Sequence, residues 1–489
     1  MASAHVLPPQ RDLVDGAWID PRGDGVMLAH PDTGAEIARS ATSAVETVDR
    51  AIAAAARDHA DGSWADRSVE DRGALLHALA HRLEGLADEF AFADAIDSGV
   101  PIGVTTLFAR ALPDIVREAV SHAEAQLGER LLPSPGGDAH LLRVPWGAAA
   151  VLMPFNAPAF TAVKKTAYAL AAGCPVLLKP SPHAPHAANL LAMSIAETVT
   201  EHDAPAGLFQ LLHGDATVGA RLAADERVRC LTFTGSRSGG RAVASAAAAS
   251  LKALQLECGS NNPAIVRADA DVDTTAESLV KGFTKLNGQW CERPGTVFVA
   301  ESLHDRLLTA LLDHLETLRP GSCLDPATTF GPQANTSQAQ SVDDAIQRLH
   351  TLGANVHMVF TDRPTGGCFR APAVITGADP ADTLDEIFGP VLVLHAVADD
   401  ARALDMANRL HGGLAAYVFS AGIADGIELG RHMNAGEVKI NGTSVLDLSP
   451  ASTQSFWIGS GIGGHGNADL LRFFTGTRIV GADPPGAPI

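Results

Sequence analysis

Between Gly147 and Glu257, short apolar runs alternate with segments of helical pattern, and this alternation restricts the possible fold more than any other feature. The predicted strands are residues 148–153, 175–179, 208–212, 229–233 and 254–257, and the predicted helices between them are 158–172, 186–200, 218–224 and 240–250. Short apolar strands that alternate with helices indicate a parallel sheet covered on both faces. Because such crossovers are right-handed, we expect a Rossmann-like α/β domain.

A second alternating series follows Cys291. Its predicted strands are residues 297–300, 391–395 and 416–419, and its predicted helices are 304–318 and 401–410. A chain of 489 residues is too long for one ordinary hydrophobic core. The sequence therefore predicts an α/β fold with two Rossmann-like parallel-sheet domains, of which the second carries Cys291.

The residues before Gly147 contain helix-start patterns. Ser43 and Glu46 form the pattern of a capping box, which predicts a helix through residue 56. Ser68 and Asp71 predict the start of another helix, whose leucines recur every three or four residues until Gly99 ends it.

Residues 129–143 interrupt the helical pattern. Prolines and glycines at residues 133–137 predict a turn between two short apolar stretches, which is typical of a β-hairpin. We expect this hairpin to be an oligomer contact. Residues 472–480 predict a further strand at the end of the chain.

Composition excludes several classes of protein. The formal net charge of -20 argues against a nucleic-acid partner or an anionic membrane surface. Residues 1–20 lack the apolar segment of a signal peptide, and the alanine-rich run 242–250 is too short to span a bilayer. The six cysteines show no CxxC pairing, which favours free thiols in a reducing cytoplasm. No histidine pair or acidic cluster with metal-ligand spacing is present, so we predict no metal site.

The stretch from Asn287 to Gly295 contains a candidate nucleophile, Cys291. Gly288 and Gly295 flank it and allow sharp turns, and the apolar run 296–300 predicts a buried strand immediately afterwards. A thiolate on a loop held by a rigid strand can add to a carbonyl carbon. The alternative is a small apolar core cysteine.

A second candidate site is the glycine-rich turn at residues 232–240, which follows a predicted strand and opens a predicted helix. A helix N-terminus offers free N–H groups to a pyrophosphate, and Gly235 and Ser236 lie at this turn. Lys179 ends a neighbouring strand, at the edge where α/β sheets bind ligands. Each feature also has an ordinary interpretation, a turn without a ligand or a solvated lysine.

Three further polar residues follow predicted strands or turns. Asn156 can donate to a developing oxyanion or cap a helix. Glu257 ends an apolar strand and can act as a general base with a raised pKa, or be an exposed strand-end acid. Glu386 precedes Phe388-Gly389-Pro390 and is either a ribose ligand or a turn acid.

Taken in order, these segments resemble the aldehyde dehydrogenase superfamily of the NAD(P)-dependent, non-acylating type. The matching segments are residues 154–156, 179–181, 233–236, 256–259, 287–291, 386–390, 413–415 and 461–464. Each segment alone is weak evidence for the family, but the order of all of them over nearly the whole chain is specific for it.

The resemblance implies a role for each matching residue. Cys291 corresponds to the nucleophile, Glu257 to the base that activates water, and Asn156 with the Cys291 backbone N–H to the oxyanion hole. The implied cofactor residues are Lys179, Ser181, Gly235, Ser236, Glu386 and Phe388. The implied reaction is oxidation of an aldehyde to the carboxylic acid through a thiohemiacetal and a thioester.

The resemblance also implies a domain layout. Residues 1–128 and 144–257 would form the NAD(P)-binding domain, residues 258–445 the catalytic domain, and residues 129–143 and 446–489 an oligomerisation arm and C-terminal tail. We expect a homodimer or homotetramer.

The choice between NAD and NADP stays open. Members that prefer NAD often have a glutamate shortly after the lysine, where this chain has Pro182. A carboxylate there would repel a 2′-phosphate, so its absence leaves NADP possible.

Two alternative functions remain. A CoA-acylating or semialdehyde-reducing relative uses another acceptor and commonly lacks the base, so Glu257 argues against it. A catalytically silent nucleotide-binding or structural homologue need not keep Cys291, Asn156 and Glu257 together.

Overall fold

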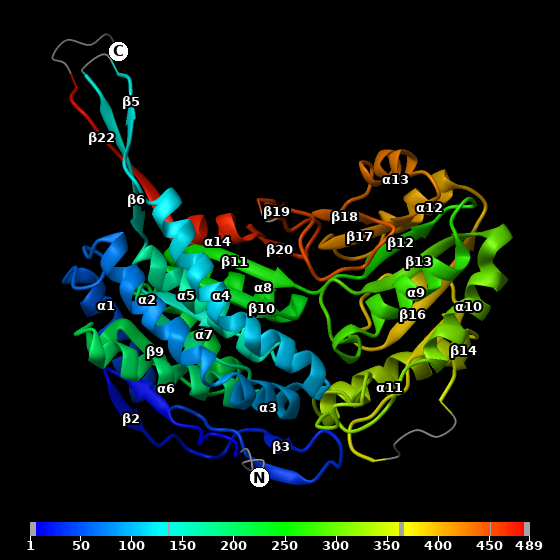
Figure 1. Ribbon diagram of the computed structural model, residues 1–489, viewed down its shortest axis with the longest axis horizontal. Helices are drawn as coiled ribbons and strands as arrows, with labels where there is room; N and C mark the ends of the chain where they lie inside the picture. The colour runs from blue at the N-terminus through cyan, green and yellow to red at the C-terminus, as the bar shows by residue number, and fades with distance from the viewer. Residues whose placement is uncertain (1–5, 135–136, 361–365, 450, 484–489) are drawn as a thin grey trace.

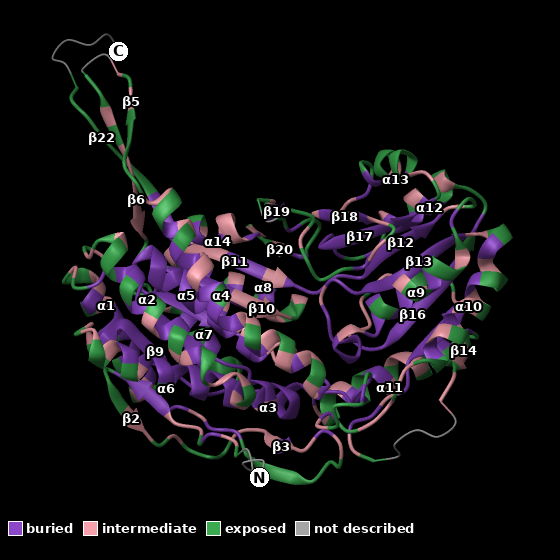
Figure 2. Ribbon diagram, in the orientation of Figure 1, coloured by how far each residue is buried: buried purple, intermediate pink, exposed green. Residues whose placement is uncertain are grey.

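Two mainly parallel sheets and a projecting three-stranded arm form the framework of the molecule (Figure 1). The structure is a computed structural model and describes residues 6–134, 137–360, 366–449 and 451–483. Figure 2 shows that buried positions follow both sheets and that the arm is mostly exposed or half-buried. The predicted α/β class with two parallel-sheet units is confirmed.

The first sheet has eight strands in the order β2-β1-β9-β8-β7-β10-β11-β20. These strands are β1 (Asp12–Val14), β2 (Ala17–Ile19), β7 (Ala149–Leu152), β8 (Val176–Lys179), β9 (Phe209–Leu211), β10 (Cys230–Gly235), β11 (Ala253–Cys258) and β20 (Gly461–Ile462). Strands β7 to β11 pair in parallel, as the alternating sequence pattern predicts. The other strands extend the sheet in antiparallel fashion at its two edges.

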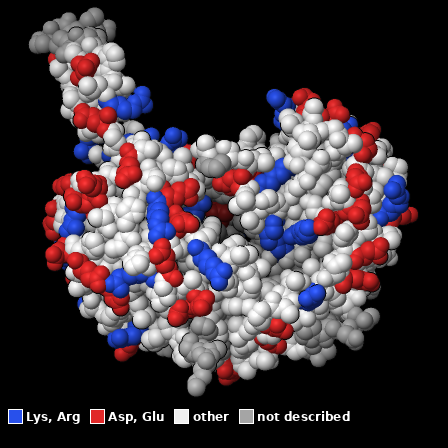
Figure 3. Space-filling model, in the orientation of Figure 1, with Lys and Arg blue, Asp and Glu red and all other residues white. Residues whose placement is uncertain are grey.

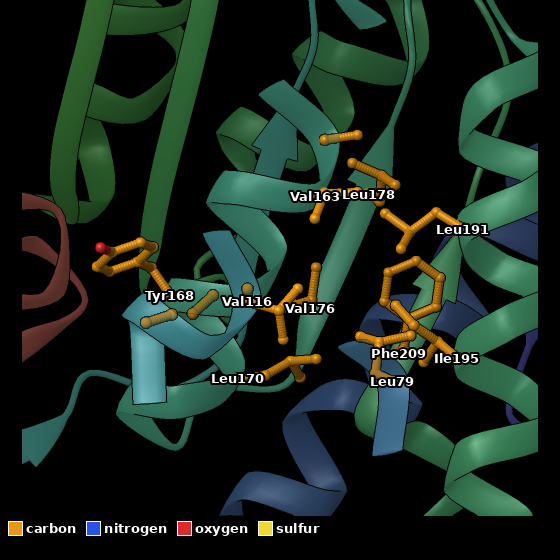
Figure 4. Packing of buried hydrophobic residues seen from close by; sticks show 14 of the residues in the cluster. Leu79, Val116, Val163, Tyr168, Leu170, Val176, Leu178, Leu191, Ile195 and Phe209 are labelled. Atoms are coloured by element: carbon orange, nitrogen blue, oxygen red, sulfur yellow. The ribbon is translucent and has the colours of Figure 1, made fainter. Parts of the chain in front are cut away.

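Helices cover both faces of this sheet. They are α1 (Val45–Ala60), α2 (Val69–Glu84), α3 (Ala87–Ser98), α4 (Ile102–Gln126), α5 (Pro158–Ala172), α6 (His186–Glu201), α7 (Ala216–Ala224), α8 (Arg237–Ala247) and α14 (Asn467–Phe473), with 3-10 turns η1 (Ala206–Leu208) and η2 (Ala248–Ser250). Val151 and Leu178 pack against the α2–α6 layer, in which Figure 4 shows Leu178 beside Val163 and Leu191. Ala150 and Leu177 pack on the other face with α1, α7 and α8. This alternation follows from the two-residue period of a strand.

Two predictions about the N-terminal helices are wrong in detail. Ser43 does not cap α1, because its hydroxyl donates to Asp12 and accepts from the His213 backbone N–H instead. The helix that begins at Ser68 does not run to Gly99, because a turn at residues 85–86 divides it into α2 and α3. Ser68 itself caps α2 as predicted.

The second sheet has seven strands in the order β14-β15-β16-β13-β12-β17-β18, with only β14 antiparallel. Its strands are β12 (Asn262–Val266), β13 (Pro294–Ala300), β14 (Asn355–Met358), β15 (Ala373–Thr376), β16 (Val391–Val397), β17 (Ala415–Phe419) and β18 (Glu437–Ile440). Its helices and 3-10 turns are α9 (Val272–Phe283), α10 (His304–Glu316), α11 (Thr336–Thr351), α12 (Asp400–Ala407), α13 (Ile423–Gly430), η3 (Lys285–Gly288), η4 (Glu301–Leu303) and η5 (Pro380–Thr383). The sequence predicted β13, α10, β16, α12 and β17 of this set and missed the others.

The arm joins two distant parts of the chain. It consists of β5 (Arg130–Leu132), β6 (Ala139–Pro145) and β22 (Thr475–Val480), in the order β22-β6-β5. The hairpin prediction is confirmed, although part of its turn, residues 135–136, lies outside the described residues. Strand β22 pairs antiparallel with β6 along its whole length, so the last strand completes the arm.

Four short strands complete the fold. They are β3 (Met27–Ala29), which pairs with β4 (Glu36–Arg39), and β19 (Gln454–Ser455), which pairs with β21 (Gly464–His465). In the C-terminal tail, β20 lies between β19 and β21 in sequence and pairs with β11, where Gly461 is opposite Glu257. The tail therefore contacts the strand that ends in a predicted site residue.

We predict that Gly461→Ala lowers the stability of the protein by about 1–3 kcal/mol, in the range of overpacked sites. Gly461 has φ +156°, and a Cβ atom there would lie 1.7 Å from the Leu256 carbonyl oxygen. Urea denaturation of both forms measures the difference. Gly442→Ala is the matched control, because a Cβ at Gly442 meets nothing within 4 Å. Equal urea midpoints for Gly461→Ala and Gly442→Ala would show that the close contact between β20 and β11 at Gly461 does not limit stability.

Candidate active site

A cavity of about 470 Å³ lies at the carboxyl ends of β7, β8, β10 and β11 and extends to Cys291. Every residue that the sequence predicts for catalysis or cofactor binding lines it: Asn156, Lys179, Ser181, Gly235, Ser236, Glu257, Cys291, Glu386 and Phe388. The loops of both sheets contribute, so residues far apart in the sequence surround one space. A cleft at this edge is the common ligand site of open α/β sheets.

The loop before Cys291 has an unusual backbone that buried amides hold in place. Leu286 and Asn287 both adopt left-handed conformations, with φ 49° and 58°. The Asn287 side chain donates to the carbonyls of Gly99 and Pro332, each at 2.8 Å, and accepts from the Gly331 N–H at 2.9 Å. Such conformations persist where the surroundings fix them.

A second amide fixes the cysteine itself. The Nδ2 of Asn262, at the start of β12, donates to the carbonyls of Cys291 and Arg293, both at 2.8 Å. Sequence reasoning did not identify Asn262, because its role depends on the parallel pairing of β12 with β13. Among the six cysteines, Cys291 is partly exposed and the other five are buried.

The thiol of Cys291 faces the Glu257 carboxylate, with 3.6 Å between Sγ and Oε1. Burial raises the pKa of the Cys291 thiol well above its usual value, and the charges of Glu257 and Glu292 raise it further. The thiol is therefore protonated at neutral pH. A thiol becomes a nucleophile by losing its proton, and the Glu257 carboxylate lies at the right position to accept it.

Three groups surround the Glu257 carboxylate on its other sides. Lys165 Nζ lies 3.9 Å from Oε2, His465 Nδ1 lies 3.9 Å from Oε1, and the Thr234 hydroxyl donates to Oε2 at 3.4 Å. Burial acts to raise the pKa of Glu257, but His465 and Lys165 outweigh it and hold the pKa at about 2. The predicted raised pKa is therefore wrong, because the two cations lie on α5 and in the C-terminal tail.

Asn156 lies next to the cysteine loop. Its Nδ2 donates to the Gln289 carbonyl at 2.8 Å, and Ala157 rather than Asn156 is the N-cap residue of α5. The helix-cap interpretation of Asn156 is therefore wrong. An asparagine amide carries two N–H donors, so the second remains available to an oxygen in the cavity.

At the far end of the cavity lie the groups predicted for a nucleotide. The Lys179 ammonium is buried and donates to the carbonyls of Pro180 and Gly214, each at 2.7 Å, and burial lowers its pKa to about 8. Ser236 is the N-cap residue of α8, and its Oγ accepts from the Gly239 N–H. A Cβ at Gly235 would lie 2.6 Å from the Phe233 ring, so Gly235 leaves the space that this ring occupies.

Between these two ends lies Glu386. Burial raises its pKa to about 7, and its Oε1 is buried without a hydrogen-bond partner. Gly259 makes room for it, because a Cβ there would lie 1.9 Å from Glu386 Oε2. Phe388 contacts Phe155 edge to face, with ring centroids 6.0 Å apart. A buried acceptor without a partner, beside an elongated cleft with a helix N-terminus, fits the ribose and phosphate groups of a dinucleotide.

Sequence reasoning missed Lys165, Glu292 and His465. Lys165 lies in a helix of apolar pattern, Glu292 follows the cysteine directly, and His465 lies in a glycine-rich tail. None of these settings predicts a contact with Glu257 or its neighbours, so no local signal identifies them.

On the face shown in Figure 3, acidic and basic side chains are interspersed. In the described part of the chain, no helix combines the length and the apolar character required to cross a bilayer.

Comparisons with known proteins agree with this geometry. Residues 18–480 match the model of the aldehyde dehydrogenase family. The chain is 32% identical to aminoacetaldehyde dehydrogenase of Pseudomonas aeruginosa over 444 residues, which cover 88% of each chain.

Solved structures give the same result. The crystal structure of an NAD-dependent aldehyde dehydrogenase from Sinorhizobium meliloti has a TM-score of 0.89 and 27% identity, covering 98% of this chain and 95% of that one. Betaine aldehyde dehydrogenase of Staphylococcus aureus, solved in complex with NAD+, has a TM-score of 0.89 and 25% identity, covering 96% and 94%. The chain therefore belongs to the aldehyde dehydrogenase family and is an NAD(P)-dependent oxidoreductase that acts on aldehydes.

Proposed function

We propose that Cys291, Glu257 and Asn156 carry out the oxidation of an aldehyde to its carboxylic acid in this protein. The observation that carries the assignment is the 3.6 Å contact between the Cys291 thiol and the Glu257 carboxylate, in a cavity that continues to the nucleotide-binding groups. Glu257 accepts the thiol proton, and the thiolate sulfur bonds to the aldehyde carbon. The free N–H of Asn156 and the backbone N–H of Cys291 stabilise the oxyanion.

The bound nicotinamide supplies the hydride acceptor. The resulting thioester on Cys291 needs a water molecule, which Glu257, after releasing the thiol proton to solvent, deprotonates for attack on the acyl carbon. The carbon–sulfur bond then breaks, the acid leaves, and the thiol regains a proton. Glu257 thus serves both half-reactions, which supports hydrolysis over transfer of the acyl group to CoA.

The cofactor residues in this proposal are Lys179 and Ser181 at the adenosine ribose, Gly235 and Ser236 at the pyrophosphate, and Glu386 with Phe388 at the nicotinamide riboside. The N-cap position of Ser236 and the unpartnered Oε1 of Glu386 support this order along the cavity. We assign residues 1–128 and 144–257 to NAD(P) binding and residues 258–445 to catalysis. We assign residues 129–143 and 446–489 to the arm and tail, although strand β6 of the arm continues to Pro145.

We further propose that NAD is preferred to NADP. Pro182 carries no charge, but the Asp215 carboxylate lines the same end of the cavity as Lys179 and Pro182. Asp215 caps α7, and its carboxylate accepts from the N–H and hydroxyl of Thr217. Hydrogen bonds from Thr217 lower the pKa of Asp215, and the Lys179 charge adds to this effect, so the carboxylate is ionised and opposes a 2′-phosphate.

We propose that the arm joins copies of this chain into a homodimer or homotetramer. Strands β5 and β22 are the edges of its sheet, and Leu131, Ile479 and Val480 are exposed on them. Apolar edge strands favour pairing with another chain. A cytoplasmic location is supported by the free state of the six cysteines.

Cys291→Ala is expected to abolish NADH formation, because the sulfur of Cys258, the other thiol that lines the cavity, lies against Gly240 of α8. Glu257→Gln is expected to slow both the first-turnover formation of NADH and the steady-state turnover by about 100-fold to 10,000-fold, because Glu257 serves both half-reactions. Stopped-flow fluorescence of NADH with a panel of aldehydes measures both phases. Cys368→Ala, which removes a buried thiol outside the cavity, is the matched control. Wild-type turnover by Cys291→Ala would overturn the assignment.

Asp215→Asn is expected to raise kcat/KM for NADP about tenfold relative to NAD, because it removes one opposing charge. Asparagine retains the helix cap, so the helix itself is preserved. Steady-state rates with both cofactors give the ratio. Asp49→Asn, which removes a carboxylate that pairs with Arg221 outside the cavity, is the control and should leave the ratio unchanged. An unchanged ratio in Asp215→Asn would exclude Asp215 as the determinant.

A further inference from the structure

His465 lies between two carboxylates of the catalytic centre. Its Nδ1 is 3.9 Å from Glu257 Oε1, and its Nε2 is 3.6 Å from Glu292 Oε1. Both ring nitrogens therefore face a carboxylate at ion-pair distance, outside hydrogen-bond range, and a positive charge on the imidazole makes both contacts attractive. The arrangement favours the imidazolium form.

The backbone around His465 fixes this position. Strand β21 pairs with β19, where His465 is opposite Gln454, and the imidazole contacts the Phe456 ring edge to face with centroids 5.6 Å apart. The preceding β20 pairs with β11 beside Glu257. The tail is thus attached to the same strand that carries the carboxylate.

Other charges surround this group from each neighbouring element. Helix α5 contributes Lys164 and Lys165, and Lys165 donates to the hydroxyls of Thr232 and Thr234. On the Glu292 side, β18 contributes Glu437 and Lys439, which pair with each other at 2.9 Å. On α14, Asp469 pairs with Arg472.

The charge distribution makes His465, together with Lys165, a direct electrostatic partner of Glu257. Burial lowers the pKa of His465, but Glu257 and Glu292 outweigh it, so the pKa is raised above its usual value. Burial raises the pKa of Glu292. The Lys165 ammonium donates to two threonine hydroxyls, whereas the two ring nitrogens of His465 face the carboxylates of Glu257 and Glu292, and the ring also packs against Phe456.

A general base must be ionised before it can accept a proton, and burial opposes ionisation of a carboxylate. We propose that His465 is a positioning residue of this reaction: held as an imidazolium by Glu257 and Glu292, it keeps Glu257 ionised at the buried site. The proposal rests on the general-base role of Glu257 proposed above. Residue 465 thereby sets the lower pH limit of catalysis, although it touches neither the thiol nor the aldehyde.

His465→Gln is expected to move the acid limb of the kcat profile to higher pH by about 1–3 units, the usual effect of losing one opposite charge near a carboxylate. Without the cation, Glu257 binds a proton at higher pH and then ceases to act as a base, so the acid limb moves to higher pH. The His465→Gln variant should lose activity at acidic pH and regain it when the pH is raised. Rates are measured by pH jump from neutral stock into buffers from about pH 4 to 9, where the wild type, with a Glu257 pKa of about 2, should lose no activity through this group and the variant should lose activity toward acid.

His465→Lys tests whether the positive charge of residue 465 or its imidazole ring is required. This variant keeps a cation but not the imidazole, and it should keep the acid limb near that of the wild type. His314→Gln removes a histidine that pairs with Asp273 on the surface, and it should have no effect. Thermal unfolding and NAD affinity of each variant establish that the proteins compared are folded.

A His465→Gln profile that superimposes on the wild-type profile would overturn the proposal, and so would an equal shift in His465→Lys. Cys291→Ala, assayed in parallel, tests the proposed function separately. If that variant is active, the general mechanism fails, whatever the histidine variants show.

Discussion

The contact between the Cys291 thiol and the Glu257 carboxylate depends on the junction between the two sheets. Glu257 lies near the end of β11, and residues 259–261 alone separate this strand from β12 of the second sheet. Asn262 at the start of β12 holds the carbonyl of Cys291, so the short connection brings acid and thiol together. Gly259 in the same connection leaves the space that Glu386 fills. The residues proposed for catalysis and those proposed to hold the cofactor therefore lie side by side where the chain passes from the first sheet to the second.

The site combines buried amides with buried charges, and these two kinds of group have different effects. Asn262, Asn287 and Gln289 satisfy backbone carbonyls and N–H groups, so the loop is rigid without adding charge. A buried carboxylate is costly unless it has a partner of opposite charge. Lys165 and His465 supply that charge to Glu257 and reverse the effect of burial on its pKa. Electrostatics, rather than burial, therefore determines the protonation state of this acid.

Local pattern predicts the parallel part of the first sheet, β7 to β11, well, because these strands are short apolar runs separated by helices. The second sheet was predicted only in part. Strand β12 begins with Asn262-Pro263, which is typical of a turn, and β14 and β15 flank a long segment without clear periodicity. Ser43 is a further position where local sequence fails to predict the structure. Its sequence neighbours indicate a helix cap, but in the folded chain its hydroxyl bonds to Asp12 and to the His213 backbone N–H instead. Tertiary contacts override local preference at such positions.

The sequence by itself determined the α/β class and the cysteine loop, because strand edges and turns leave signals within a few residues, and its resemblance to a family completed the set of candidate residues that line one cavity. Only the tertiary structure decided the electrostatics of that cavity. His465 is more than 200 residues from Glu257 in the chain, yet the pairing of β20 with β11 brings it to 3.9 Å. The energy of two charges depends on their separation in space and on burial, and neither quantity is encoded in any local stretch of sequence.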